Sequence, residues 1–83
     1  MSASAARIAP DPLATEVEFT DAALRVVLAD GREVSAPLAW LPSLLDASAE
    51  DRANWRLIGR GQGIHWPALD EDVSVRALLG LPT

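Results

Sequence analysis

The sequence contains no cysteine. This absence excludes disulfide bonds, thiolate ligands for a metal ion and a cysteine nucleophile, and it fits a reducing cytoplasm. No stretch approaches the ~18 consecutive apolar residues of a membrane-spanning helix. The first residues, MSASAARIAPDPLA, also lack the apolar run of a secretory signal. We therefore expect a cytoplasmic protein with no membrane association.

Lysine is absent as well, so all seven basic residues are arginine, and the sequence contains twelve acidic residues. A net charge of −5 disfavours binding to nucleic acid, because phosphates attract clustered basic side chains. The same charge suits a partner with a basic surface. Aromatic residues are few, and each is expected to lie in the core or at a partner contact. They are Phe19, Trp40, Trp55 and Trp66.

Eighty-three residues with 49% hydrophobic side chains make one small domain that is too apolar for a disordered chain. Residues 1–13 are small or polar and are interrupted by Pro10 and Pro12, which predicts a flexible N-terminal tail. Residues 14–83 are predicted to form a single α+β domain.

Apolar and polar residues alternate after residue 14 and again over residues 23–28, which predicts two strands. Residues 21–22 form the short turn between them. The side chains expected to face the core are Val17, Phe19, Leu24, Val26 and Leu28.

Two loop lengths can connect the second strand with a third over about residues 33–38. A two-residue loop would pair Val26 with Ser35 and mix core and solvent faces. A three-residue loop over residues 29–31 pairs Val26 with Val34, and these matching faces favour the longer loop. The glycine that ends this loop then occupies the left-handed position of the turn.

Residues 56–59 and 64–66 predict a second hairpin around a glycine-rich bend. Ile64 and Trp66 lie on one face of it and His65 on the other. The acids at positions 70–72 are interpreted as the entry to a final helix, whose dipole they stabilise.

Three short helices are expected, one begun by a proline and two capped by serines. The second is too short to be stable alone and must dock through residues such as Ala53. The expected ranges are 42–47 from Pro42, 49–55 after Ser48, and 75–79 between Ser74 and Gly80. The predicted fold is therefore α+β: a small antiparallel sheet of two hairpins plus a third strand pairing, with two or three short helices packed on it.

The sequence contains Trp-x-Pro-x-Leu at Trp40 to Leu44 and GQGIHWPALDEDVSV at Gly61 to Val75. These two motifs resemble those of the domain of unknown function 2442 family of bacterial and phage proteins. The similarity covers about residues 17–80, and it departs at Ser43, where the family often has arginine. It implies a small α+β fold, relatives fused to helix-turn-helix domains, and gene pairs that look like toxin–antitoxin modules.

Three patterns invite a chemical interpretation, and each is better explained by structure. The acids at 70–72 lack the spacing of a calcium loop. His65 has no nucleophile motif beside it, and the G-x-G-x-G at residues 59–63 is not a phosphate-binding loop. We therefore expect no enzyme, and no catalytic, cofactor-binding or metal-binding residue.

The composition and the resemblance favour a non-enzymatic protein–protein interaction module, the acidic, antitoxin-like member of a pair. The alternative is a small regulatory or DNA-associated accessory domain, without direct nucleic acid binding by this chain. The expected partner is a small basic protein from the adjacent gene, or a second copy of the chain. The predicted partner contacts are Trp40, His65, Trp66, Asp70 and Asp72.

Overall fold

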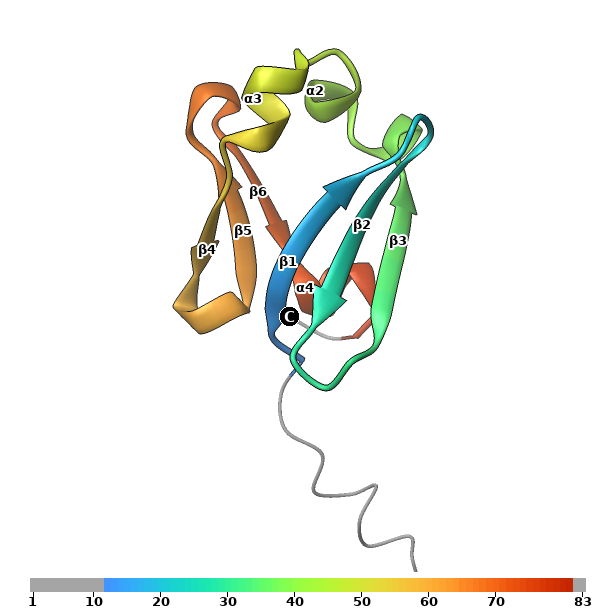
Figure 1. Cartoon of the computed structure of the whole chain (residues 1–83), viewed down its shortest axis with the longest axis vertical. Coiled ribbons are helices and arrows are strands. Elements are labelled where there is room, and N and C mark those ends of the chain that lie inside the picture. The colour runs from blue at the N-terminus through green and yellow to red at the C-terminus, as the bar shows by residue number, and fades with distance from the viewer. Residues whose placement is uncertain (1–11, 82–83) are drawn as a thin grey trace, which may run out of the picture.

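Within residues 12–81, which the computed structural model describes, six strands form two antiparallel sheets of three strands each (Figure 1). The predicted α+β class is confirmed, although the strands divide into two sheets rather than one. Residues 1–11 of the predicted tail lie outside the described residues, and the first strand begins at Ala14. The strands are β1 (Ala14–Phe19), β2 (Ala23–Leu28), β3 (Glu33–Pro37), β4 (Arg56–Ile58), β5 (Gly63–Trp66) and β6 (Glu71–Ser74).

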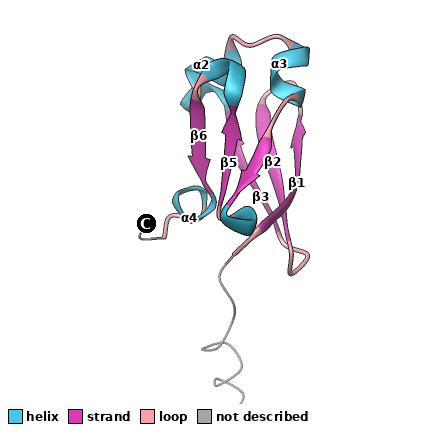
Figure 2. Cartoon of the chain, turned by 90° about the vertical axis from the view of Figure 1, so that its left-hand side faces the viewer, coloured by secondary structure: helices cyan, strands magenta, loops and turns pink. Residues whose placement is uncertain are grey.

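The helices are short and gather at the two ends of the sheets. Figure 2 shows α2 and α3 at one end and α4 at the other. They are α2 (Pro42–Leu45), α3 (Ala49–Ala53) and α4 (Val75–Leu78), with single 3₁₀ turns η1 (Leu38–Trp40), η2 (Gly59–Gly61) and η3 (Pro67–Leu69). No helix among the described residues is long and apolar enough to cross a membrane.

The first sheet has the order β1-β2-β3, and its register is the predicted one. Val26 pairs with Val34, as the three-residue loop requires, and the N–H of Leu28 donates to the carbonyl of Arg32 at 2.8 Å. Gly31, with φ +93°, occupies the left-handed position of this loop. The core-facing residues of β2 are at most 2% exposed, so the predicted inward face is confirmed.

The second sheet has the order β4-β5-β6, and its third strand corrects the sequence interpretation. The acids at 70–72 are not a helix entry loop, because Glu71 already pairs with Trp66 in the ladder between β5 and β6. Asp70 takes a left-handed conformation, φ 49° and ψ 43°, and turns the chain back along β5. Val73 is buried whereas Asp72 is exposed, which is the alternation of a half-buried strand.

The core contains residues from both sheets, and Trp66 is its largest fully buried side chain. Its indole meets the ring of Phe19 edge to face, with the ring centroids 6.2 Å apart. The indole N–H donates to the backbone carbonyl of Arg52 at 3.0 Å. The core residues are Ala14, Val17, Leu24, Val26, Leu28, Leu38, Leu44, Ile64, Trp66, Val73 and Val75.

Helix α3 begins as predicted but ends earlier and docks differently. The hydroxyl of Ser48 accepts from the N–H of Asp51 at 3.1 Å, which confirms the predicted cap. Ala53 is exposed, so the expected docking through it is wrong. With no buried residue of its own, α3 is held by Arg52, whose guanidinium donates to the carbonyls of Leu44 and Leu45, each at 2.9 Å.

Helix α4 begins where predicted and ends at Leu78, one residue earlier than predicted. Ser74 accepts from the N–H of Ala77 at 3.2 Å, and Gly80 leaves the helix with φ +74°. At the opposite end of the sheets, the hydroxyl of Ser43 donates to the carboxylate of Glu71, which ties α2 to β6.

Candidate functional site

The five predicted contact residues do not form one site. Trp40 is the most exposed large apolar side chain of the described chain, at 74%. It ends the η1 turn, whose first residue, Leu38, is only 1% exposed. The buried leucine holds the turn against the core, so the indole two residues later is presented to solvent.

Trp66 lies at the opposite extreme, with none of its surface exposed. Its side chain belongs to the core and cannot contact a partner in this fold, so the prediction of Trp66 as a partner contact is wrong. The cause is strand alternation: Trp66 shares the inward face of β5 with Ile64, which is also fully buried.

His65 and Asp72 come together on the outer face of the second sheet. They are direct cross-strand partners on β5 and β6, and the imidazole Nδ1 lies 2.5 Å from the Asp72 Oδ1. Arg56 of β4 is the partner of His65 on its other side. A guanidinium, an imidazole and a carboxylate therefore form one row across the sheet. Asp70 is exposed in its left-handed turn and does not join this pair.

Within the described part of the chain, His65 and Asp72 belong neither to a metal-binding group nor to the lining of the pocket. No group of three or more His, Asp or Glu within residues 12–81 is arranged to hold a metal ion. Neither His65 nor Asp72 lines the pocket described next. The arrangement can make hydrogen bonds and ion pairs at a surface.

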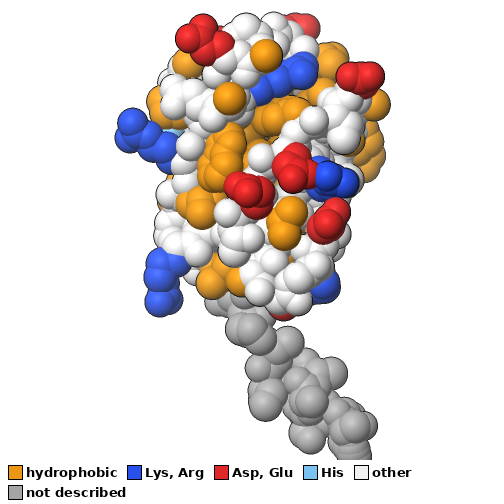
Figure 3. All heavy atoms as spheres, in the orientation of Figure 1, with side chains coloured by type: hydrophobic (Ala, Val, Ile, Leu, Met, Phe, Trp, Pro, Cys, Tyr) orange, Lys and Arg blue, Asp and Glu red, His pale blue; other side chains and the backbone are white. Residues whose placement is uncertain are grey.

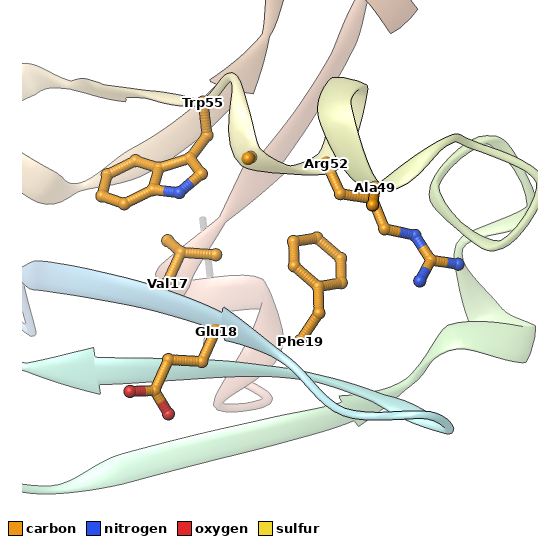
Figure 4. Close-up of a pocket in the computed structure, with 7 residues that line it drawn as sticks. Val17, Glu18, Phe19, Ala49, Arg52 and Trp55 are labelled. Carbon is orange, nitrogen blue, oxygen red and sulfur yellow. The ribbon is translucent and has the colours of Figure 1, made fainter.

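Sequence reasoning missed a groove of about 260 Å³ between the first strand and the α3–β4 segment. In Figure 4, Val17 points from β1 toward the indole of Trp55 and Phe19 points toward α3, whereas the Glu18 carboxylate points away. The Arg52 guanidinium carbon lies 5.3 Å from the centroid of the Phe19 ring at one end of the groove. The lining residues are Val17, Glu18, Phe19, Ala49, Arg52, Ala53 and Trp55.

The surface around the groove combines apolar and acidic side chains. Figure 3 shows hydrophobic side chains in the middle of this face with acidic side chains beside them. On the outer side of the first sheet, Arg25 Nε donates to Glu18 at 2.9 Å and lies 3.7 Å from Glu33. The hydrogen bond to Glu18, with the charges of Glu18 and Glu33, raises the pKa of Arg25.

Two antiparallel three-stranded sheets closed by short helices define a small α+β domain. Residues 14–81 match the model of a family described as "Protein of unknown function (DUF2442)", and the chain belongs to this family. The chain is also similar to a crystal structure of a protein of unknown function from Rhodospirillum rubrum ATCC 11170. The two are 27% identical with a TM-score of 0.71, over 87% of this chain and 90% of the other. No curated protein matches the chain.

Proposed function

We propose that this chain is a non-enzymatic protein–protein interaction module. The observation that carries the proposal is Trp40, whose indole is 74% exposed. A tryptophan on a surface keeps a large apolar area in water, and such residues are typical anchors of protein interfaces. Burying this indole against a partner would remove that area from solvent.

A second exposed apolar side chain follows Trp40 by five positions and supports the same proposal. Leu45 is 46% exposed and belongs to α2, which follows directly after the η1 turn. Its neighbour Leu44 is fully buried, just as Leu38 is buried beside Trp40. Both exposed side chains are therefore presented by short segments that are anchored in the core, and little ordering is needed when a partner binds.

The net charge of −5 supports a partner with a basic surface. We assign this role to a small basic protein from the adjacent gene, with the present chain as the acidic, antitoxin-like member of the pair. A second copy of the chain is the alternative occupant of the Trp40 surface.

The test is co-expression of the chain with the protein encoded by the adjacent gene, followed by affinity purification and size-exclusion chromatography. We expect a complex, and we expect Trp40→Ala to weaken it at least about tenfold, as at an interface anchor. Leu81→Ala removes another exposed large apolar side chain and is the matched control. Circular dichroism verifies that both variants are folded.

Three other results of this experiment would each contradict one part of the proposal. If no complex forms and the chain does not restore growth to cells that express the neighbouring protein, the antitoxin-like role is excluded. If Trp40→Ala binds as well as Leu81→Ala, the partner uses another surface. If the chain elutes alone as a dimer that Trp40→Ala dissociates, the Trp40 surface joins two copies.

A further inference from the structure

Strand β1 is an edge of the first sheet, and the hairpin with β2 determines which of its backbone groups are free. The N–H of Thr20 donates to the carbonyl of Ala23 at 2.9 Å and closes the hairpin. Hydrogen-bonded and non-hydrogen-bonded pairs alternate along an antiparallel ladder. The N–H and C=O groups of Glu18 therefore point toward β2, whereas those of Val17 and Phe19 point away from it.

No other strand of the described chain takes up these outward groups, because β1 pairs with β2 alone. A row of unpaired N–H and C=O groups on an edge strand is a template for a further strand. Val17 is an interior position of β1 and Phe19 is its last residue, so the free row covers its second half.

The groove runs along the same half of β1. The side chains of Val17 and Phe19 form one wall, and Trp55 with residues of α3 forms the other. At the start of β1 the two sheets touch, because Gly61 packs against the backbone of Ala14. The groove therefore lies beside the free backbone groups of β1, and its walls are largely apolar on the side where alternate side chains of an added strand would point.

The opposite face of such an added strand would meet acids. Glu16 and Glu18 alternate with Val17 and Phe19 along β1, and Glu33 lies on the same outer face of the sheet. Arg25 is the one basic residue that pairs with them, and Glu16 makes no ion pair among residues 12–81. Opposite charges on neighbouring strands stabilise the pairing.

We propose that the free edge of β1 binds an extended segment of a partner protein, which adds to the first sheet as a fourth strand. The segment alternates apolar residues, placed in the groove against Phe19 and Trp55, with arginine or lysine opposite Glu16 and Glu18. Main-chain hydrogen bonds provide affinity in this mode, and the alternate side chains provide specificity.

This inference goes beyond the proposed function because it concerns a different surface from that of Trp40. The Trp40 surface and the β1 edge are each proposed to bind a polypeptide, but Trp40→Ala leaves the β1 edge intact. Loss of either site therefore does not imply loss of the other.

The probe is a synthetic eight-residue peptide of alternating valine and arginine, titrated into the full chain and followed by calorimetry and by amide NMR. We expect binding that shifts the amide signals of Val17 and Phe19 and protects these amides from hydrogen exchange. A peptide of alternating valine and glutamate is expected to bind at least about tenfold more weakly, because it meets like charges.

N-methylated peptides test the backbone geometry without changing the protein. Methyl groups on the alternate amides that face β1 should abolish binding, whereas methyl groups on the intervening amides should not. On the protein, Glu16→Gln should weaken the arginine peptide about two- to fivefold. Asp70→Asn removes another exposed acid, outside the groove, and should leave binding unchanged.

The proposal is overturned if the two N-methylated peptides bind alike, or if the signals of Val17 and Phe19 do not move. Equal binding of the glutamate peptide removes the basic character assigned to the segment. A dimer of the chain that protects the same amides without peptide would assign the edge to a second copy and overturn the assignment to a partner protein.

Discussion

A Cβ atom on residue 61 would lie 2.4 Å from the carbonyl oxygen of Ala14. The bend between β4 and β5 and the start of β1 therefore touch backbone to backbone, with no side chain between them. Gly61 is buried and has φ +108°, so glycine is required both by the conformation and by the space. This contact joins the two sheets at the start of β1.

Replacing Gly61 by alanine should therefore destabilise the fold by at least about 2 kcal/mol, from backbone strain and from displacement of β1. Gly31→Ala is the matched control, because Gly31 also has a positive φ but a Cβ there meets nothing within 4 Å. It should cost only about 1–2 kcal/mol. Urea unfolding followed by circular dichroism measures both. Equal losses in the two variants would show that the contact with Ala14 contributes nothing.

Arg52 connects three parts of the chain through one guanidinium. It donates to the carbonyls of Leu44 and Leu45 at the end of α2, and it lies over the Phe19 ring. Arg52→Ala should cost about 2 kcal/mol. Arg52→Lys should recover less than half of this loss, because a lysine ammonium lacks the planar fork that reaches both carbonyls.

The control for the Arg52 variants is Arg56→Lys, at an exposed arginine on β4. This change should stay within about 0.5 kcal/mol of the wild type in the same urea unfolding experiment. If a lysine at position 52 restored full stability, the positive charge would account for the contribution of this side chain and the fork geometry would be unimportant.

Local signals predicted the first sheet down to its register, because Val26 and Val34 must share a face and Gly31 must end the loop. The helix caps Ser48 and Ser74 were also predicted correctly, because capping depends on residues only three positions apart. Strand β6 was not predicted because Val73 is its only apolar residue, and one apolar residue among polar ones does not define an alternation.

The groove had no signal in the sequence. Phe19 and Trp55 lie on opposite walls, far apart in the chain, and no spacing rule connects them. The same limit explains Trp66, whose alternation with His65 was predicted correctly. Which face of β5 is covered depends on the packing of the first sheet against it, and that packing is a property of the whole chain.

Replacing tryptophan by phenylalanine should have different effects on stability at Trp66 and at Trp40, because Trp66 is buried and Trp40 is exposed. Trp66→Phe removes volume from the core and leaves the Arg52 carbonyl without the indole donor that it accepts from. This should cost about 2–4 kcal/mol. Trp40→Phe, at a 74% exposed site, should change stability by no more than about 0.5 kcal/mol. Urea unfolding should be followed by circular dichroism, since each variant loses one fluorescent indole. Similar losses would contradict the burial difference.

The turn between β2 and β3 should carry a pH-dependent part of the stability. The Asp30 carboxylate accepts from the backbone N–H of Arg32 at 3.0 Å and pairs with its Nε at 2.7 Å. The backbone hydrogen bond from Arg32, together with its side chain, lowers the pKa of Asp30 below 3.8 in the folded chain. Because the folded pKa is the lower one, the ionised carboxylate stabilises the fold above pH 3.8, and this stabilisation is lost as the pH falls through the folded pKa.

Asp30→Asn keeps an oxygen that can accept from the Arg32 N–H but removes the charge. The wild type should therefore melt at a slightly higher temperature than this variant at pH 7, and the difference should shrink once the pH falls below 3.8. Thermal unfolding of both proteins between neutral and strongly acidic pH measures the difference. If it stays constant over this range, the effect of the substitution comes from side-chain shape and not from the ionised carboxylate.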